Sequence, residues 1–165
     1  MAGMKVRVLK VDHYQANVDE LNRGLQAGRT IDGWQMPKYS EPGDIAVWYA
    51  TAPRQKYIAW GWVTGPPRPG FRGNDSLYIG PVAGMRSIEP VPRLKAAESS
   101  GFNQNPNSVI PQAQTVPDEM ADDFLVALGL DPRLMEQISS EYGGYCHESP
   151  EASRRTSAKV AADRS

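Results

Sequence analysis

The segment Ile45-Ala-Val-Trp-Tyr-Ala50, together with Ile58-Ala-Trp-Gly-Trp-Val63, decides the fold. Apolar side chains dominate both segments, and each is preceded by residues typical of a turn, Pro42-Gly43-Asp44 before the first and Pro53 to Lys56 before the second. Successive side chains of a strand point to opposite faces, so each segment has two apolar faces. The two segments predict strands over 45–50 and 57–63 that pair as an antiparallel hairpin.

The faces of these strands follow from the alternation. In the first strand, one face holds Ile45, Val47 and Tyr49, and the other holds Ala46 and Trp48. In the second strand, strict alternation places Ile58, Trp60 and Trp62 together, opposite Tyr57, Ala59, Gly61 and Val63. Gly61 leaves the position between Trp60 and Trp62, on the opposite face, without a side chain.

Before the hairpin, residues 5–11 predict a strand with Val6 and Val8 on one face and the basic Lys5 and Arg7 on the other. A short helix follows from Asn17, with Glu20 three residues later as in a capping box, and ends near Gly28. Residues 28–42 show neither the helical nor the strand period. We therefore expect a loop there, and this loop would carry Trp34.

After the hairpin, residues 68–75 predict a mobile basic loop. Residues 77–88 indicate an edge strand, or two short strands broken by a bulge, because glycine and proline interrupt them. A helical turn is expected over 92–97. Thr115 and Asp118 predict a capping pair for a helix that ends at Gly129, and a shorter helix is expected from Asp131 through Ile138.

These elements sum to four to six short strands and three or four small helices. The fold class is α+β, a small mixed, mostly antiparallel β-barrel with peripheral short helices, because closure removes the edges that short strands would expose. One domain is expected over residues 1–142. Residues 143–165 are polar, and we expect a disordered C-terminal tail there.

Composition excludes several classes of protein. Cys146 is the only cysteine, which excludes an internal disulfide and a cysteine-rich metal site, and only His13 and His147 could add ligands. No apolar run approaches the ~20 residues that span a bilayer, so a cytoplasmic protein is expected. No phosphate loop, dinucleotide fingerprint or nucleophile elbow occurs. We expect neither a metal nor a cofactor.

Charge is distributed unevenly along a chain whose formal net charge is −1. Residues 50–100 carry seven basic and three acidic side chains, whereas residues 101–150 carry eight carboxylates and one arginine. The middle third therefore predicts a cationic surface for a polyanion such as nucleic acid, although a solvated surface with accidental clustering has the same signature. The candidate phosphate contacts are Arg54, Lys56, Arg68 and Arg72.

The four tryptophans fall within 29 residues of one another. A tryptophan on a strand is ordinarily a core residue, but a small barrel hardly encloses four. We therefore expect that at least two indole rings, those of loop-borne Trp34 and one strand tryptophan, line an open slot for a planar base. Amides close to Pro106 would read the edge of that base, unless they form an ordinary turn; these are Asn103, Gln104, Asn107 and Ser108.

Four segments follow one another along the chain: Pro42-Gly43-Asp44-Ile-Ala-Val-Trp-Tyr-Ala-Thr51, then Ile58 to Val63, then Ser108-Val-Ile-Pro111, and a final helix. In the order of these segments the chain resembles the EVE domain of the PUA-like superfamily, which shares its barrel with the YTH readers of methylated adenine. The resemblance covers roughly residues 4–140. It implies a noncatalytic domain that flips a modified base out of a nucleic acid and holds it in an aromatic pocket. In prokaryotes the nucleic acid implied is modified DNA, and a partner nuclease often accompanies the domain. The implied base-binding positions are Trp34, Trp48, Tyr49, Thr51, Trp62, Asn103, Asn107 and Ser108. Ala50 stands where EVE sequences often show histidine.

Other functions stay open. The related ASCH domains include hydrolases of acylated nucleosides that use lysine, threonine and glutamate, and the candidates here are Lys38, Thr51 and Glu41, whose spacing departs from a Lys-x-x-Thr pattern. An RNA-binding PUA-like module and a peptide-binding interaction module are further alternatives.

Overall fold

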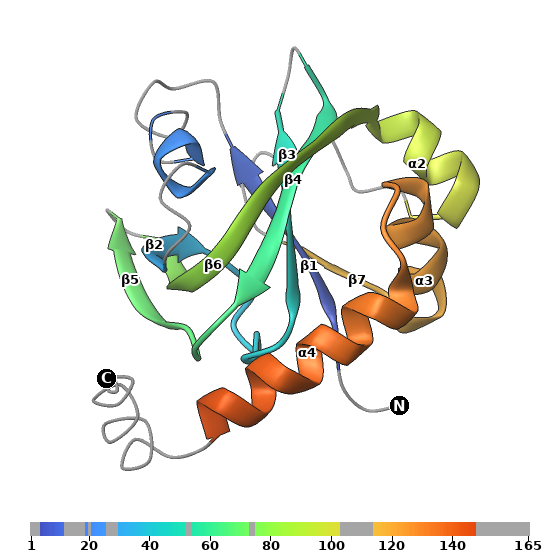
Figure 1. Cartoon of the computed structure of the whole chain (residues 1–165). Helices are drawn as coiled ribbons and strands as arrows, with labels where there is room; N and C mark the ends of the chain where they lie inside the picture. Colours follow the sequence, from blue (N-terminus) through green and yellow to red (C-terminus); the bar gives the residue numbers. More distant parts are fainter. Residues whose placement is uncertain are drawn as a thin grey trace.

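A computed structural model describes residues 4–11, 19, 21–25, 30–51, 54–72, 75–102 and 114–147. The side chains of residues 71–72, 75–77 and 141–147 fall outside this description. In the described part, seven strands form a single mixed sheet (Figure 1). The strands are β1 (Val6–Val11), β2 (Ile31–Gln35), β3 (Ile45–Ala50), β4 (Lys56–Val63), β5 (Arg68–Arg72), β6 (Asp75–Pro92) and β7 (Gln114–Val116).

The sheet curls into a half-barrel with the strand order β2-β6-β4-β3-β1-β7, and β5 pairs with β6 beside this path. Only the pair of β1 and β3 is parallel; every other pair in the described sheet is antiparallel. Three helices, α2 (Arg93–Ser100), α3 (Asp118–Ala127) and α4 (Pro132–His147), gather on one side of it (Figure 1). The predicted α+β barrel-like architecture is confirmed.

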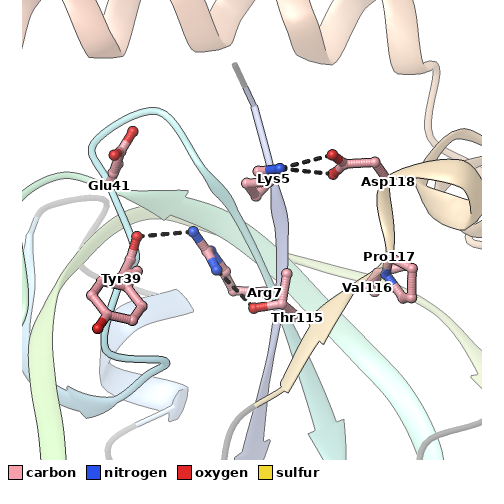
Figure 2. Close-up of a pocket in the computed structure, with 8 residues that line it drawn as sticks. All are labelled: Lys5, Arg7, Tyr39, Glu41, Thr115, Val116, Pro117 and Asp118. Carbon is pink, nitrogen blue, oxygen red and sulfur yellow. Dashed lines mark hydrogen bonds and ion pairs between the residues drawn. The ribbon is translucent and has the colours of Figure 1, made fainter. Parts of the chain in front are cut away.

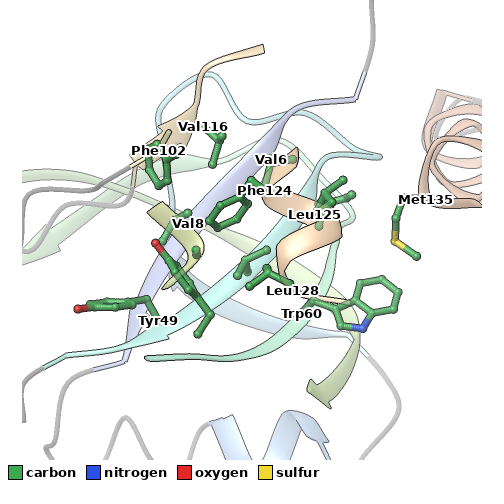
Figure 3. Close-up of a cluster of buried hydrophobic side chains, with 14 of the residues drawn as sticks. Val6, Val8, Tyr49, Trp60, Phe102, Val116, Phe124, Leu125, Leu128 and Met135 are labelled. Carbon is green, nitrogen blue, oxygen red and sulfur yellow. The ribbon is translucent and has the colours of Figure 1, made fainter. Parts of the chain in front are cut away.

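The sheet is buried on both faces. Ile45, Val47 and Tyr49 belong to one core cluster, which includes Phe124 and Leu125 of α3 (Figure 3). Ala46 and Trp48 belong to a second cluster with residues of β2 and β6. The face assignment predicted for β3 is therefore confirmed, and a strand with two apolar faces requires such a double core.

A β-bulge changes the face assignment of β4. Trp48 pairs with Ala59 and Tyr49 pairs with Tyr57, so Ile58 is an extra residue opposite the partner strand. Tyr57 consequently joins Trp60 and Trp62 in the first core cluster, while Ile58 packs against the second. The predicted grouping of Ile58 with Trp60 and Trp62 is wrong, because alternation ends at a bulge.

The gap left by Gly61 is filled from the neighbouring strand. A Cβ atom added to Gly61 would lie 3.2 Å from Cζ3 of Trp48 and 3.0 Å from the carbonyl oxygen of Ala83. The sequence Trp60-Gly61-Trp62 therefore accommodates the Trp48 indole on the opposite face of the sheet.

The loop predicted over residues 28–42 is wrong in part, since Ile31–Gln35 forms β2 and pairs with β6. Gly33 adopts φ 97°, and the pairing register shifts between Ile31 and Trp34. This irregularity buries Ile31 and Trp34, three residues apart, so the strand lacks the period of two that sequence analysis seeks.

The next segment also differs from its prediction. Residues predicted as a mobile basic loop include β5, which pairs with the start of β6. The interrupted edge strand predicted over 77–88 is part of the long β6, which pairs with β2, β4 and β5 and is therefore internal. Register shifts along the pairing of β4 with β6, together with φ 67° at Gly84, accommodate the glycines and prolines.

The helices begin and end partly as predicted. Gly129, with φ 83°, follows α3 as expected, but Thr115 and Asp118 do not form a capping pair: Pro117 occupies the N-cap position and no side chain caps it. The turn predicted over 92–97 is the eight-residue α2, and α4 continues past Ile138 to His147. Within the described ranges, none of the helices is long and apolar enough to span a membrane.

Candidate functional site

The tryptophans of the predicted slot are core residues. Trp34, Trp48, Trp60 and Trp62 are 5%, 0%, 5% and 2% exposed. Trp34 and Trp48 pack edge to face with ring centroids 5.6 Å apart, and Trp60 and Trp62 do the same at 5.5 Å. An aromatic cluster is present, but these rings contact each other directly. The expectation that two indole rings leave the interior as facing walls is wrong for this structure, and Trp34 lies on a strand.

Tyr49 lies at the carboxyl end of β3, in a buried polar group that faces the end of the half-barrel. Its ring is 5.2 Å from that of Tyr57, at the start of β4, and Arg93 at the start of α2 is also buried. Burial raises the pKa of Tyr57 well above its usual range, Tyr49 adds to the rise, and Arg93 opposes it. The Tyr57 hydroxyl has no hydrogen-bond partner in the described structure.

The N-terminus of α2 is fixed beside this group. The backbone N–H of Arg93 donates to the carbonyl of Gln55, between Arg54 and Lys56, at 3.0 Å. Pro92 at the N-cap offers no side-chain cap, and the first turn holds no acidic residue. Arg54, Lys56 and Lys95 are exposed at this corner. Cations and a helix N-terminus without a side-chain cap therefore share one end of the sheet.

The remaining predicted residues are placed as follows. Thr51 follows β3, and its backbone N–H donates to Val11 at 3.1 Å. Arg68 pairs with Asp32 at 2.9 Å, a contact that lowers the pKa of that carboxyl. The Arg72 side chain, together with Asn103, Gln104, Asn107 and Ser108, lies outside the described residues. No group of acidic, histidine or cysteine residues that could hold a metal ion occurs among those described.

The three residues considered for an ASCH-like hydrolase do not converge. Glu41 precedes β3 and Thr51 follows it. A strand of six residues spans ~20 Å, so the carboxylate and the hydroxyl lie at opposite ends of the sheet.

Sequence analysis did not find a second candidate site, at the other end of β1. A pocket of about 460 Å³ opens there between the Tyr39–Glu41 turn and the junction of β7 with α3 (Figure 2). Its lining residues are Lys5, Arg7, Tyr39, Glu41, Thr115, Val116, Pro117 and Asp118. This volume lies in the range of small-molecule sites.

Arg7 lies in this pocket and is only 7% exposed. Its Nε donates to Asp44 at 2.8 Å, its Nη1 donates to the Thr115 hydroxyl at 2.7 Å, and its Nη2 donates to the Tyr39 carbonyl at 3.0 Å. Burial raises the pKa of Asp44, while hydrogen bonds from the Glu41 and Lys5 backbones and the Arg7 charge oppose the rise. The guanidinium is thereby held rigidly at the pocket.

The rim of the pocket combines an ion pair with an exposed ring. Lys5 donates to both carboxylate oxygens of Asp118, at 3.0 and 2.8 Å, and this contact lowers the pKa of Asp118. The Tyr39 side chain is 75% exposed. The Lys38 ammonium lies 5.4 Å from the centre of the Tyr39 ring and 5.5 Å from that of Tyr78, and both tyrosines raise the pKa of Lys38.

Comparison with known proteins identifies the fold. The ASCH protein of Zymomonas mobilis superposes with a TM-score of 0.52 at 12% sequence identity, covering 74% of this chain and 94% of the other. A mutant of that protein gives 0.52 at 11% identity, over 74% and 97% of the two chains. A Rhodopseudomonas palustris protein gives 0.50 at 12% identity, over 76% and 94%.

The chain therefore shares the fold of these ASCH proteins. No protein-family model matches the sequence, and no curated protein matches it. The fold that the resemblance implies is confirmed, and assignment to the PUA-like superfamily and to the EVE domain stays a prediction.

Proposed function

We propose that this protein is a noncatalytic nucleic-acid-binding module that holds phosphates at the N-terminus of α2. The observation that carries the proposal is the first turn of α2, which has no side-chain cap and is joined to the Arg54–Lys56 turn by the hydrogen bond from Arg93 to Gln55. The ASCH-like, PUA-like fold supports it by analogy alone.

The physical argument is electrostatic. The first N–H groups of a helix lack intrahelical partners, and the helix dipole makes this end partly positive, so anions bind there. In α2 the Arg93 N–H already donates to Gln55, so the contact proposed for a phosphate uses the N–H groups that follow it. Arg93 and Lys95 lie in the first turn of α2, where basic side chains oppose the dipole. A bound phosphate would offset this repulsion, and the exposed Arg54 and Lys56 would extend the contact along a nucleic-acid backbone.

The test measures how binding depends on salt. The double variant Arg54→Gln/Lys56→Gln is compared with wild type by fluorescence anisotropy, using single-stranded RNA, single-stranded DNA and duplex DNA. Each lost phosphate contact on a single strand reduces the slope of log K against log salt by ~0.7, so a reduction of about 1.4 is expected. Arg23→Gln/Arg133→Gln removes the same charge from exposed positions outside this corner and is the matched control.

Two results would contradict the proposal. One is the absence of binding to every oligonucleotide at low salt, which would favour the peptide-binding alternative. The other is an equal loss of slope in both double variants, which would show a diffuse response to net charge.

Recognition of a modified base, with modified DNA as the favoured polymer and a partner nuclease, is the finer form of this proposal and rests on the resemblance to EVE domains. The burial of all four indoles means that such a base would need another aromatic contact or a rearrangement of the core. Methylated and unmodified probes therefore belong in the same titration. Equal affinities would remove modified-base recognition and leave phosphate binding intact.

A further inference from the structure

The pocket beside Arg7 offers hydrogen-bond donors that the described residues do not use. A guanidinium carries five N–H groups, one on Nε and two on each terminal nitrogen. Asp44, Thr115 and Tyr39 accept three of them. Within the described part of the chain, one N–H on Nη1 and one on Nη2 therefore remain for a ligand. Because the three bonds that are made fix the side chain, these two donors on neighbouring nitrogens are held in place for the acceptors of a ligand.

Arg7 offers donors to a ligand, whereas Glu41 offers an acceptor. Its backbone N–H donates to Asp44 at 2.9 Å, which fixes the turn, while its side chain is exposed and lines the pocket. An ionised carboxylate is an acceptor only. A ligand that satisfies both residues carries two adjacent acceptors on one edge and N–H donors on another.

Tyr39 adds an aromatic surface. Its backbone carbonyl is held by Arg7, while its ring is exposed beside the guanidinium (Figure 2). Pro117 lies across the pocket from this ring, while the Val116 side chain is buried in the core cluster. Flat aromatic surfaces of this kind stack with planar heterocycles.

The described charges of the site give an anion no net attraction. Lys5, Arg7 and, at the rim, Lys38 are balanced by Glu41, Asp118 and, behind Arg7, Asp44. A neutral ring with hydrogen-bonding edges needs no net charge, so it fits this site better than a phosphate does.

The geometry points to a binding site for a guanine base. Guanine presents O6 and N7 as adjacent acceptors, the pair that arginine recognises, and its N1–H and N2–H₂ groups donate on the other edge, toward Glu41. Adenine replaces O6 by an amino donor, which would face the Arg7 donors, and cytosine and uracil lack N7. This site takes the base without its phosphate, so it does not depend on the contact proposed at α2.

The test titrates ¹⁵N-labelled protein with guanosine, inosine, adenosine, cytidine and guanosine 5′-monophosphate, followed by NMR. We expect guanosine to shift the signals of Arg7, Thr115 and Asp118 at the lowest concentration. Inosine, which lacks the N2 amino group, binds more weakly, and adenosine and cytidine more weakly still. The monophosphate binds no more tightly than guanosine.

Substitutions at two exposed residues test the contribution of ring stacking and that of the carboxylate separately, without disturbing the core. Tyr39→Leu removes the stacking surface and weakens guanosine binding by about 5-fold or more. Glu41→Gln abolishes the preference for guanosine over inosine. Glu119→Gln, an exposed carboxylate in the first turn of α3 outside the pocket lining, leaves both affinities unchanged.

The proposal is overturned if guanosine shifts none of these signals, if all four nucleosides shift them equally, or if the monophosphate binds far more tightly than guanosine. The last result would identify a phosphate site here. Because the free nucleosides carry no phosphate, each of these outcomes is independent of the salt dependence tested for Arg54 and Lys56.

Discussion

Arg7 connects three separate parts of the chain. Its guanidinium contacts the Tyr39 turn, Asp44 before β3, and Thr115 in β7. Asp44 is 2% exposed and also accepts hydrogen bonds from the backbones of Lys5 and Glu41. A buried ion pair with every partner in place is tolerated, whereas removal of one partner leaves an uncompensated charge.

The cost of removing one partner from this buried ion pair gives the first stability prediction. Asp44→Ala should lower the free energy of unfolding by about 3 to 5 kcal/mol, because it leaves the buried Arg7 charge without its counter-ion and the backbone N–H groups of Lys5 and Glu41 without an acceptor. Urea denaturation followed by circular dichroism measures the change. Asp118→Ala is the control, since that carboxylate is exposed. Similar midpoints for the two variants would show that the Arg7 network contributes little.

The pair of Lys5 and Asp118 predicts a pH effect. The pKa of Asp118 is lowered in the folded state, so its contribution to stability is present above the ordinary aspartate pKa and is lost as the pH falls through the lowered value. Lys5→Met should raise the pKa of Asp118 toward its ordinary range. A carboxyl titration by NMR measures this. The pKa of Asp32, which is lowered by Arg68, should stay unchanged; a shift of both carboxyls would indicate a global change.

Among the elements, the β3–β4 hairpin was predictable because both segments are apolar, follow turn residues and are largely buried. The β2 strand was not, because φ 97° at Gly33 and the register shift at Trp34 break its period. The same reasoning failed at Ile58, where one extra residue changes the face. Local pattern thus predicts regular strands and misses those in which pairing with a distant strand determines the register.

The candidate sites show the same limit. Arg54 and Lys56 were predictable as basic residues next to a turn, and both are exposed. The position of the α2 N-terminus beside them could not be predicted, because it depends on the hydrogen bond from Arg93 to Gln55. Arg7 was predicted on the face opposite Val6 and Val8, with no partner assigned, and it is buried there with Asp44. The useful signal was the aspartate that directly precedes an apolar strand, since a buried carboxylate requires a cation.

Helix α4 is attached to the sheet by a specific bond. The buried Ser139 hydroxyl donates to the Gly43 carbonyl at 2.6 Å, whereas the exposed Ser140 hydroxyl donates to Gln137 within its own helix at 3.0 Å. Ser139→Ala should therefore destabilise the protein by about 1 kcal/mol, and Ser140→Ala should have a smaller effect. Thermal unfolding of the two matched variants distinguishes them. Equal melting temperatures would mean that apolar packing of α4, by Met135 and Ile138, holds the helix without this bond.

At the scale of the whole molecule, the C-terminal third completes the core. Val116, Phe124, Leu125, Leu128 and Met135 all belong to the cluster that contains Val6 and Val8 of β1 (Figure 3). A chain ending at residue 113 lacks all five of these and should show no cooperative urea transition by tryptophan fluorescence. A chain ending at His147 is the control and should retain the midpoint of the full chain. A cooperative transition in the shorter chain would contradict this assignment.

The two proposed sites lie at opposite ends of β1 and β3. The guanine pocket surrounds Lys5 and Arg7 before β3, and the phosphate contact lies beyond the end of β3, near Thr51 and Arg54. A single-stranded oligonucleotide that reached both would place a base at one end of the half-barrel and its backbone at the other.

The bond from Arg7 to Thr115 joins residues 108 positions apart, and this has a consequence for synthesis. Chains are made from the N-terminus at ~5 to 20 residues per second, so β1 leaves the ribosome several seconds before its β7 partner exists. During that interval one edge of β1 is without its neighbour and the Arg7 guanidinium lacks the Thr115 hydroxyl. The nascent protein is therefore most vulnerable to aggregation just before its last strand and helices emerge.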